Sequence, residues 1–218
     1  MVVLNVADPA TESFADLHDR LGLVPLHRIR LRPYPGTANE ADVVLAKSRN
    51  QRLCELVEGV LLEKTMGQKE AMLALFIGRM IGEFADADDL GIVLGADGMY
   101  RLKLGLIRIP DVSFIPWSRL PGNEVPDEEI GNVIPTLAVE VLSRSNTVGE
   151  IDRKIGEYFA SGVKIVWTVD PRKESVRVYT SATTYKMFDQ ESILEGGKVL
   201  PGFRLPLKKL FSVGRRKK

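Results

Sequence analysis

The chain contains few of the residues from which many binding sites are built. Of its 218 residues one is cysteine, Cys54, and two are histidine, His18 and His27. A single cysteine excludes an internal disulfide and the zinc sites that need several thiolates, and it is typical of a reducing compartment. We therefore expect a cytoplasmic protein in which Cys54 is a packed side chain and not a nucleophile. The two isolated histidines are expected to be ordinary structural residues and not ligands.

The sequence also lacks an excess of charge and a long apolar run. Lys and Arg number 30 and Asp and Glu number 29, so the formal net charge is +1, which excludes a strongly cationic surface that binds nucleic acid without specificity. Residues 215–218 are all basic and are expected to form a solvated tail. The N-terminus has no basic segment followed by an apolar core, so no signal peptide is expected. The most apolar helical stretch, 71–84, carries Arg79 and Glu83 and is too short to cross a bilayer.

Size and composition predict one soluble globular domain. With 44% hydrophobic and 27% charged residues, the chain is long enough to bury one ample core. We expect a single domain over 1–218, with a helical extension over 1–50 packed on it and a basic tail over 211–218.

The pattern of apolar and turn residues predicts an α/β fold. Helical periodicity and capping residues indicate four helices, and short apolar runs between glycines and prolines indicate strands. The expected helices are 11–21, 39–49, 68–87 and 147–161. The expected strands lie in 54–64, 91–94, 99–102, 111–115, 136–142, 163–169, 175–179 and 184–188, followed by a closing segment over 201–210. The runs 91–94, 99–102 and 111–115 resemble parts of one bent sheet. The order strand, helix, strand over 136–169 favours a parallel, right-handed pair.

Glu140 is the most informative residue, because it is an acid inside the apolar run 136–142. Removing a carboxylate from water costs several kcal/mol unless it is protonated, paired or bound to a metal. Strand alternation places Glu140 on the face opposite to Val139 and Val141, near the carboxyl end of the strand, where open α/β sheets bind ligands. Asp111 has similarly apolar neighbours. Two hard oxygen donors without a histidine cluster or thiolates indicate magnesium or manganese.

Lys154 completes the predicted centre. It lies one turn into the helix that follows the Glu140 strand, four residues after Glu150, with which it forms a favourable i,i+4 pair. It borders the buried stripe of this helix, so its ammonium is expected at the rim of a cleft. A divalent metal lowers the pKa of a bound water and neutralises a phosphate, while a lysine orients the water or stabilises developing charge. Asp111, Glu140 and Lys154 together predict hydrolysis of a phosphodiester.

The order of these motifs resembles that of a known family. Ile-Pro-Asp-Val at 109–112, Val-Glu-Val-Leu-Ser at 139–143, a lysine in the next helix and the strand over 163–169 with its following Asp-Pro are similar to motifs of the Uma-two family of restriction-endonuclease-like proteins, within the PD-(D/E)XK nuclease superfamily. The resemblance extends from residues 54–59 to 200–203. It implies a restriction-endonuclease-like fold with a mixed, bent central sheet flanked by helices. It also implies that Asp111 and Glu140 are metal carboxylates and that Glu55 is an additional acid near the site.

Two positions depart from the superfamily pattern. The superfamily usually places its lysine two residues after the glutamate on the same strand, and Leu142 occupies that position here. Lys154 is therefore expected to act from the helix, as its position in the family implies. Many relatives also have a histidine at the start of the long helix, and residues 68–70 contain none.

Plainer structural roles are open to the same residues. The alternatives are an ion pair with Arg144 or Arg153 for Glu140, a turn cap for Asp111, a solvated helix position for Lys154 and an exposed strand position for Glu55. Glu150 is expected to close a capping box with Thr147, and Tyr158 and Trp167 are expected to pack in the core.

The leading hypothesis is a magnesium-dependent endonuclease that hydrolyses DNA, with manganese as another suitable metal. Asp111 and Glu140 bind the metal and Lys154 assists. DNA is the expected partner, a homodimer is possible because a duplex has two strands, and no membrane is involved. The alternative hypothesis is a noncatalytic nucleic-acid-binding or interaction protein that keeps the fold and has lost the chemistry. A third is a phosphoesterase that acts on small nucleotides.

Overall fold

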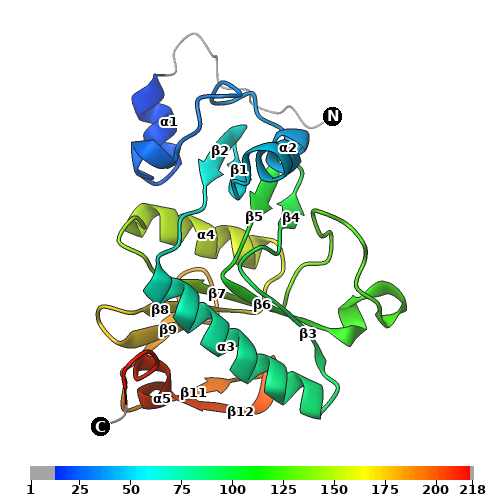
Figure 1. The fold of residues 1–218 in the computed structure, drawn as a ribbon, viewed down its shortest axis with the longest axis vertical. Coiled ribbons are helices and arrows are strands. Elements are labelled where there is room, and N and C mark those ends of the chain that lie inside the picture. Colours follow the sequence, from blue (N-terminus) through cyan, green and yellow to red (C-terminus); the bar gives the residue numbers. More distant parts are fainter. Residues whose placement is uncertain (1–12, 217–218) are drawn as a thin grey trace.

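The computed structural model of the protein describes residues 13–216. Within this range the chain forms three β-sheets, of four, six and two strands, with helices between and outside them (Figure 1). Residues 11 and 12 of the first expected helix, and residues 217 and 218 of the expected basic tail, lie outside the described range.

The first sheet is built on the predicted hairpin. Its strands are antiparallel and follow the order β2 (Val60–Glu63), β1 (Cys54–Val57), β5 (Leu106–Arg108) and β4 (Tyr100–Lys103). Glu58 and Gly59, between β1 and β2, have φ angles of 50° and 69°, as a tight hairpin turn requires. Helices α1 (Phe14–Arg20) and α2 (Glu40–Asn50) lie near this sheet, and the side chain of Asn39 caps α2 as expected.

The second sheet is mixed and lies at the centre of the molecule. Its strands follow the order β10 (Tyr185–Phe188), β9 (Ser175–Tyr179), β8 (Ile165–Asp170), β7 (Leu137–Val141), β6 (Val112–Pro116) and β3 (Gly91–Leu94). β7 and β8 are parallel, with Glu140 opposite Thr168, whereas the other neighbouring pairs are antiparallel. The connection between them contains α4 (Val148–Ala160), so the predicted parallel strand–helix–strand unit is confirmed.

The remaining elements complete the fold around these sheets. They are α3 (Gln68–Ala87), the two-stranded sheet of β11 (Ile193–Gly196) and β12 (Leu200–Pro206), α5 (Leu207–Phe211), and short 3₁₀ turns at Leu26–Arg28, Trp117–Arg119 and Pro121–Asn123. The long helix α3 has the bounds that the apolar periodicity predicts. No helix among the described residues is long and apolar enough to span a membrane.

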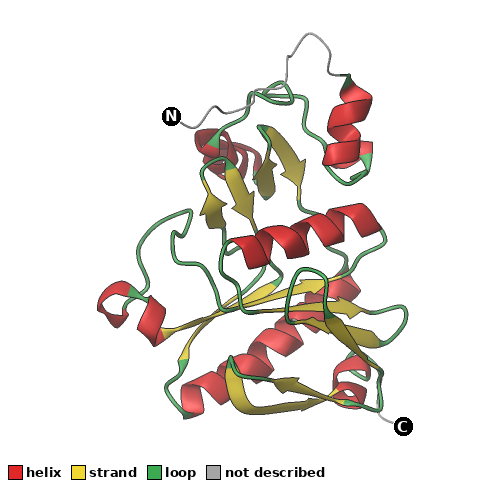
Figure 2. Ribbon diagram, turned by 180° about the vertical axis from the view of Figure 1, so that it is seen from behind, coloured by secondary structure: helices red, strands yellow, loops and turns green. Residues whose placement is uncertain are grey.

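The two faces of the central sheet pack against different helices. α3 covers one face, and α4 lies on the other, between the central sheet and the first sheet (Figure 2). Leu137, Val139 and Val141 of β7 belong to the core that contains α3, whereas Ala138 belongs to the core that contains α4. Because side chains alternate along a strand, Glu140 faces α4 together with Ala138, as predicted.

α4 is positioned by its cap and by its buried stripe. The hydroxyl oxygen of Thr147 accepts a hydrogen bond of 3.1 Å from the N–H of Glu150, which starts the helix. Ile151, Ile155 and Tyr158 are buried in the core beneath it. This stripe fixes the rotation of α4 and therefore the direction in which Lys154 points.

The expected single bent sheet is wrong in one respect. β3 and β6 belong to the central sheet, but β4 pairs with β5 in the first sheet. β5 was not predicted from the sequence, because residues 106–109 merge with the apolar run that continues to Ile115. Pro110 has no N–H to donate to a ladder, and at this residue the chain leaves the first sheet and enters the central one.

Candidate active site

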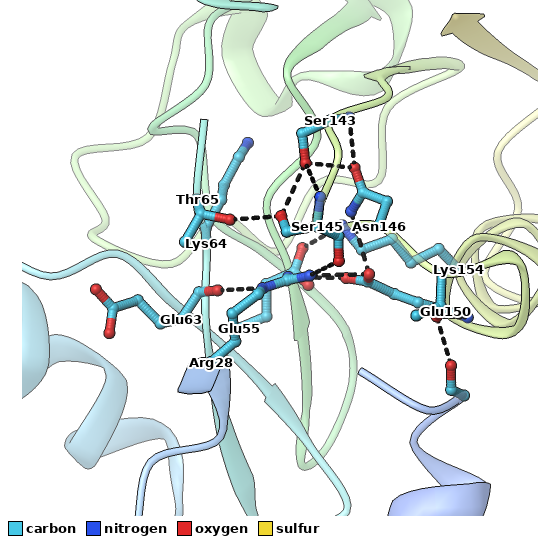
Figure 3. A network of polar contacts seen from close by, with 12 residues as sticks. Arg28, Glu55, Glu63, Lys64, Thr65, Ser143, Ser145, Asn146, Glu150 and Lys154 are labelled. Carbon is cyan, nitrogen blue, oxygen red and sulfur yellow. Dashed lines mark hydrogen bonds and ion pairs between the residues drawn. The ribbon is translucent and has the colours of Figure 1, made fainter. Parts of the chain in front are cut away.

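The predicted site residues come from four elements that meet where the first sheet, α4 and the central sheet converge. Glu55 lies on β1, Asp111 directly precedes β6, Glu140 lies on β7 and Lys154 lies on α4. All four are buried. A fifth residue, Lys64, directly follows β2 and pairs with Asp111. Figure 3 labels Lys64, Glu55 and Lys154 in the polar network around Arg28.

Asp111 is held by the neighbouring strand and by a lysine. Its N–H donates to the carbonyl of Val139 at 2.9 Å, and its Oδ2 accepts from the N–H of Val141 at 2.7 Å. Its Oδ1 lies 2.8 Å from Nζ of Lys64. These contacts lie across the end of β7 and not within the turn that follows Pro110. The carboxylate is thereby fixed beside the backbone of the residue that follows Glu140.

Glu140 is held by two residues of α4. Its Oε1 accepts a hydrogen bond of 2.6 Å from the hydroxyl of Tyr158, and both carboxylate oxygens lie 3.3 Å from Nζ of Lys154. Arg153, one of the two arginines considered as a partner, instead binds Glu58 and Glu157. Tyr158 packs in the core as predicted, and in addition its hydroxyl orients the acid.

Lys154 is more deeply buried than the sequence indicates. Its side chain is 3% exposed, and its Nζ lies 3.0 Å from Oε1 of Glu55 in addition to its contacts with Glu140. The expected position at a rim is therefore wrong, because the lysine bridges two buried acids that belong to different sheets. Its expected partner Glu150 instead forms a buried ion pair with Arg28, at 2.8 Å (Figure 3).

The expected capping box at the start of α4 is only half formed. Thr147 accepts the predicted bond from the backbone of Glu150. The Glu150 carboxylate, however, accepts from Arg28 and from the side-chain amide of Asn146. An arginine that reaches α4 from the N-terminal segment is a stronger partner for a buried carboxylate than a backbone N–H.

Glu55 faces the interior and not solvent. Cys54 and Leu56 on the same strand pack in the core next to α2, so alternation turns Glu55 toward α4. It is 1% exposed and accepts from Arg108 at 2.7 Å and from the N–H of Ile109 at 3.1 Å. With Lys154, these donors occupy its carboxylate fully.

The electrostatics distinguish the two glutamates that share Lys154. Burial and the neighbouring carboxylates of Asp111 and Glu55 raise the pKa of Glu140 above its ordinary value, although Lys154 opposes this shift. Burial also acts to raise the pKa of Glu55, but Lys154 and Arg108 outweigh it and lower that pKa to about 2. Glu140 is thus the less well compensated of the two carboxylates.

Lys154 itself stays protonated. Burial acts to lower its pKa, but the carboxylates of Glu140 and Glu55 outweigh this effect and raise the pKa above the ordinary value of a lysine. A lysine in this state does not accept a proton at neutral pH. It holds the two glutamates in place as a permanent cation.

Two surface hollows share a lining residue, and one of them contains Asp111. One, of about 510 Å³, is lined by Asp111 and Ala96 together with small residues of α3, and its volume is typical of ligand sites. The other, of about 430 Å³, is lined by Arg144 and Ser143, and Met66 lines both. A further cavity of about 600 Å³ contains none of the predicted site residues in its lining. Asp111 therefore connects the buried cluster with the surface.

The donor set fits one kind of metal site and not another. Within the described part of the chain, no three His, Cys, Asp or Glu side chains are grouped to hold a metal ion by themselves. Magnesium, however, is commonly bound through one or two carboxylates, with waters and substrate phosphates as the other ligands. Asp111 and Glu140 supply two such carboxylates at adjacent strands, whereas Glu55 is fully occupied by Arg108, Lys154 and a backbone N–H. The residues fit a magnesium ion shared with a phosphate and do not fit a closed structural site.

Lys64 was not among the predicted site residues. Alternation along the strand is the local pattern that could have indicated it. Lys64 lies two residues after Leu62, which faces the core that contains α4, so both side chains are expected on the same face. Arg108 was missed as well, because it occupies the unpredicted strand β5. Lys64 and Arg108 can be assigned to the site only once the two sheets are known to lie on either side of α4.

Comparison with known proteins agrees with this fold. Residues 40–208 match the Uma2 family, described as putative restriction endonuclease. The chain is also similar to a solved structure described as a putative nuclease belonging to DUF820 from Anabaena variabilis ATCC 29413, with 21% identity and a TM-score of 0.67 over 78% of this chain and 96% of the other. No curated protein matches the chain. The likeness confirms the restriction-endonuclease-like α/β fold, and the match over most of the sequence shows that the chain belongs to the Uma2 family of putative restriction endonucleases.

Proposed function

We propose that this chain is a nuclease that hydrolyses DNA phosphodiester bonds with magnesium bound by Asp111 and Glu140. The observation that carries the proposal is that two buried carboxylates lie at neighbouring strands, and that one of them lines a hollow of about 510 Å³. Membership of a family described as restriction endonucleases supports the same reaction. The single cysteine favours a cytoplasmic setting. A homodimer remains a prediction.

The residues of the chain divide the work of such a reaction. When bound, magnesium supplies charge neutralisation for the phosphate and lowers the pKa of a water. Asp111 is oriented by the N–H of Val141, and Glu140 is oriented by Tyr158 and Lys154, so both carboxylates are positioned before substrate arrives. Lys154 thus acts as a positioning residue, since its ammonium contacts carboxylates and not the hollow.

Cleavage of supercoiled DNA in magnesium or manganese tests this proposal. We expect nicking or cutting by the unaltered protein, and a loss of at least about 10³-fold in Asp111→Asn and Glu140→Gln, because a catalytic metal contributes several kcal/mol to the transition state. Glu191→Gln is the matched control, since Glu191 is an exposed acid that pairs with Lys208. Full activity of either site variant would rule out the assigned metal ligands.

Two other outcomes distinguish the alternative functions. DNA binding without cleavage, and without any thermal shift on addition of manganese, indicates a noncatalytic nucleic-acid-binding or interaction protein. The absence of a lysine at position 142 is the feature that favours this alternative. Hydrolysis of bis(p-nitrophenyl) phosphate without cleavage of DNA indicates a phosphoesterase for small nucleotides.

A further inference from the structure

The surroundings of Lys64 resemble a cation site. Its Nζ lies 2.8 Å from Oδ1 of Asp111 and donates to the carbonyl oxygens of Ile109 at 2.7 Å and Ala96 at 3.3 Å. The side chain is 9% exposed. An ammonium has three donors, and these three oxygens match them. The lysine head therefore occupies a position surrounded by hard oxygen atoms, one of which belongs to a proposed metal ligand.

Lys64 lies closer to the hollow than Lys154 does. Asp111 and Ala96, two of the three groups that Lys64 contacts, line the hollow of about 510 Å³. Glu55 and Glu140, the partners of Lys154, do not line it. The backbone of Lys64 is anchored by its N–H, which donates to the carbonyl of Leu53 at 2.8 Å. The stem of the lysine is flexible, so the head can move while the backbone stays in place.

A metal ion on Asp111 is incompatible with the present position of the Lys64 head. A divalent cation that binds Asp111 would lie within a few ångströms of the ammonium, and like charges at that separation repel strongly in a partly buried site. Metal binding must therefore displace the ammonium. The adjoining hollow offers the nearest open space, and a phosphate bound there would be its new partner.

We propose that Lys64 is a resident counterion of Asp111, which competes with the metal for this carboxylate and, once displaced, binds the phosphate of the substrate. The inference rests on the proposed function, because it requires a metal at Asp111. It accounts for the burial of the Asp111 side chain in the absence of a metal. It also supplies an ammonium at the hollow, although Leu142 occupies the usual lysine position.

Manganese affinity and DNA cleavage test the two parts separately in Lys64→Met. Loss of the competing charge is expected to tighten manganese binding by about tenfold or more, measured by calorimetry. Loss of the phosphate contact is expected to slow cleavage by about 10²-fold at saturating manganese, the effect of removing one stabilising donor. Lys64→Arg keeps the charge and is expected to retain an affinity close to that of the unaltered protein. Weaker manganese binding together with slower cleavage in Lys64→Met would mean that Lys64 only supports the fold, and would overturn the proposal.

Amine labelling of the unaltered protein gives an independent test that requires no variant to fold. With acetic anhydride and peptide mass spectrometry, Lys64 is expected to be labelled several times faster after manganese is added. Lys198 is an exposed lysine and should be labelled equally in both states. If manganese binds through Asp111 but the labelling of Lys64 does not change, this inference fails while the proposed function stands. If no manganese binds, the proposed function fails and the inference fails with it.

Discussion

Glu55 and Glu140 share one lysine, yet the fold treats their charges in opposite ways. Glu55 also has Arg108 and a backbone N–H, and its pKa falls to about 2. Glu140 has Lys154 and a tyrosine hydroxyl, and its pKa rises because burial and two nearby carboxylates prevail. Ion pairing therefore stabilises the ionised form of Glu55, while burial and the two nearby carboxylates disfavour the ionised form of Glu140.

We predict opposite changes in the stability of the metal-free protein when each acid is neutralised. Glu55→Gln should lower the free energy of unfolding by about 3–5 kcal/mol, since it leaves Arg108 and Lys154 short of a partner. Glu140→Gln should raise it, and Tm with it, because burial and the carboxylates of Asp111 and Glu55 disfavour the ionised acid. Thermal denaturation at pH 7.5 with EDTA measures both changes. Destabilisation by Glu140→Gln would contradict the raised pKa.

The pH dependence follows from the sign of each shift. A lowered pKa means that the contribution of Glu55 is present above its ordinary value of 4.5 and is lost as the pH falls from there toward about 2. Glu140 has a raised pKa, so its contribution is present below 4.5 and is lost as the pH rises. Acid unfolding of Glu55→Gln should accordingly show a weaker pH dependence between about 4.5 and 2 than that of the unaltered protein.

Single residues were predictable from sequence where they break a pattern. Glu140 and Asp111 are acids in apolar strands, so they attract notice without any knowledge of the fold. Lys64 follows Glu63 at the end of a hairpin and breaks no pattern, because a lysine is ordinary there. Lys154 was found, but its burial was not, since helix periodicity places it only at the border of the buried stripe and the acid from β1 is remote in sequence.

At the scale of elements, the start of α4 is fastened to the N-terminal segment. Gly22 has a φ of +78°, and a Cβ at this residue would lie 2.5 Å from the backbone of Glu150 and Gly149. The hydroxyl of Thr147 donates to the carbonyl of Gly22 at 2.5 Å. This close backbone approach is possible only because Gly22 has no side chain.

Gly22→Ala and Gly105→Ala separate packing from backbone strain. Gly105 has a similar φ of +74°, but nothing lies within 4 Å of its added Cβ. Gly105→Ala should cost about 1–2 kcal/mol for the left-handed backbone alone. Gly22→Ala should cost about 1–3 kcal/mol more, because α4 must shift away. Urea unfolding of both variants measures the difference, and equal losses would show that the contact with α4 contributes nothing.

The elements that sequence predicts well are those with local signals. The bounds of α3 and the turn of the first hairpin follow from apolar periodicity and from Glu58-Gly59. β5 and the division of the strands between two sheets depend on which segments pair across the molecule, and that information is not local. Pro110 lies where the chain passes from the first sheet to the central one, but a proline in the sequence does not indicate which sheet each flanking strand joins.

At the scale of the whole molecule, a net charge of +1 means that any affinity for DNA must come from local groups. Arg144 lines the hollow of about 430 Å³ that adjoins the Asp111 hollow at Met66. Under the proposed function, a second phosphate of the bound strand would lie near this hollow. Arg144 is thus one basic residue placed for a backbone contact.

Arg144→Ala should weaken DNA binding without changing the reaction itself. Loss of one phosphate contact reduces the slope of log affinity against log salt by about one, for every DNA sequence alike. Fluorescence anisotropy with calcium in place of magnesium, over a range of salt concentrations, measures this slope. Arg204→Ala is the control. Arg204 is an exposed arginine on β12 that lies near Glu195 and does not line either hollow. An unchanged slope would exclude Arg144 from the DNA contact.

The ion pair between Arg28 and Glu150 sets a limit on how the chain can be shortened. The family match begins at residue 40. Arg28, before this boundary, pairs with Glu150, which is 1% exposed and lies on α4 with Lys154. A protein cut at the family boundary would retain Glu150 and lose its arginine, which leaves an uncompensated charge in the interior. The family boundary and the folding boundary therefore differ, and Arg28, before that boundary, belongs to the structure that positions the helix carrying Lys154.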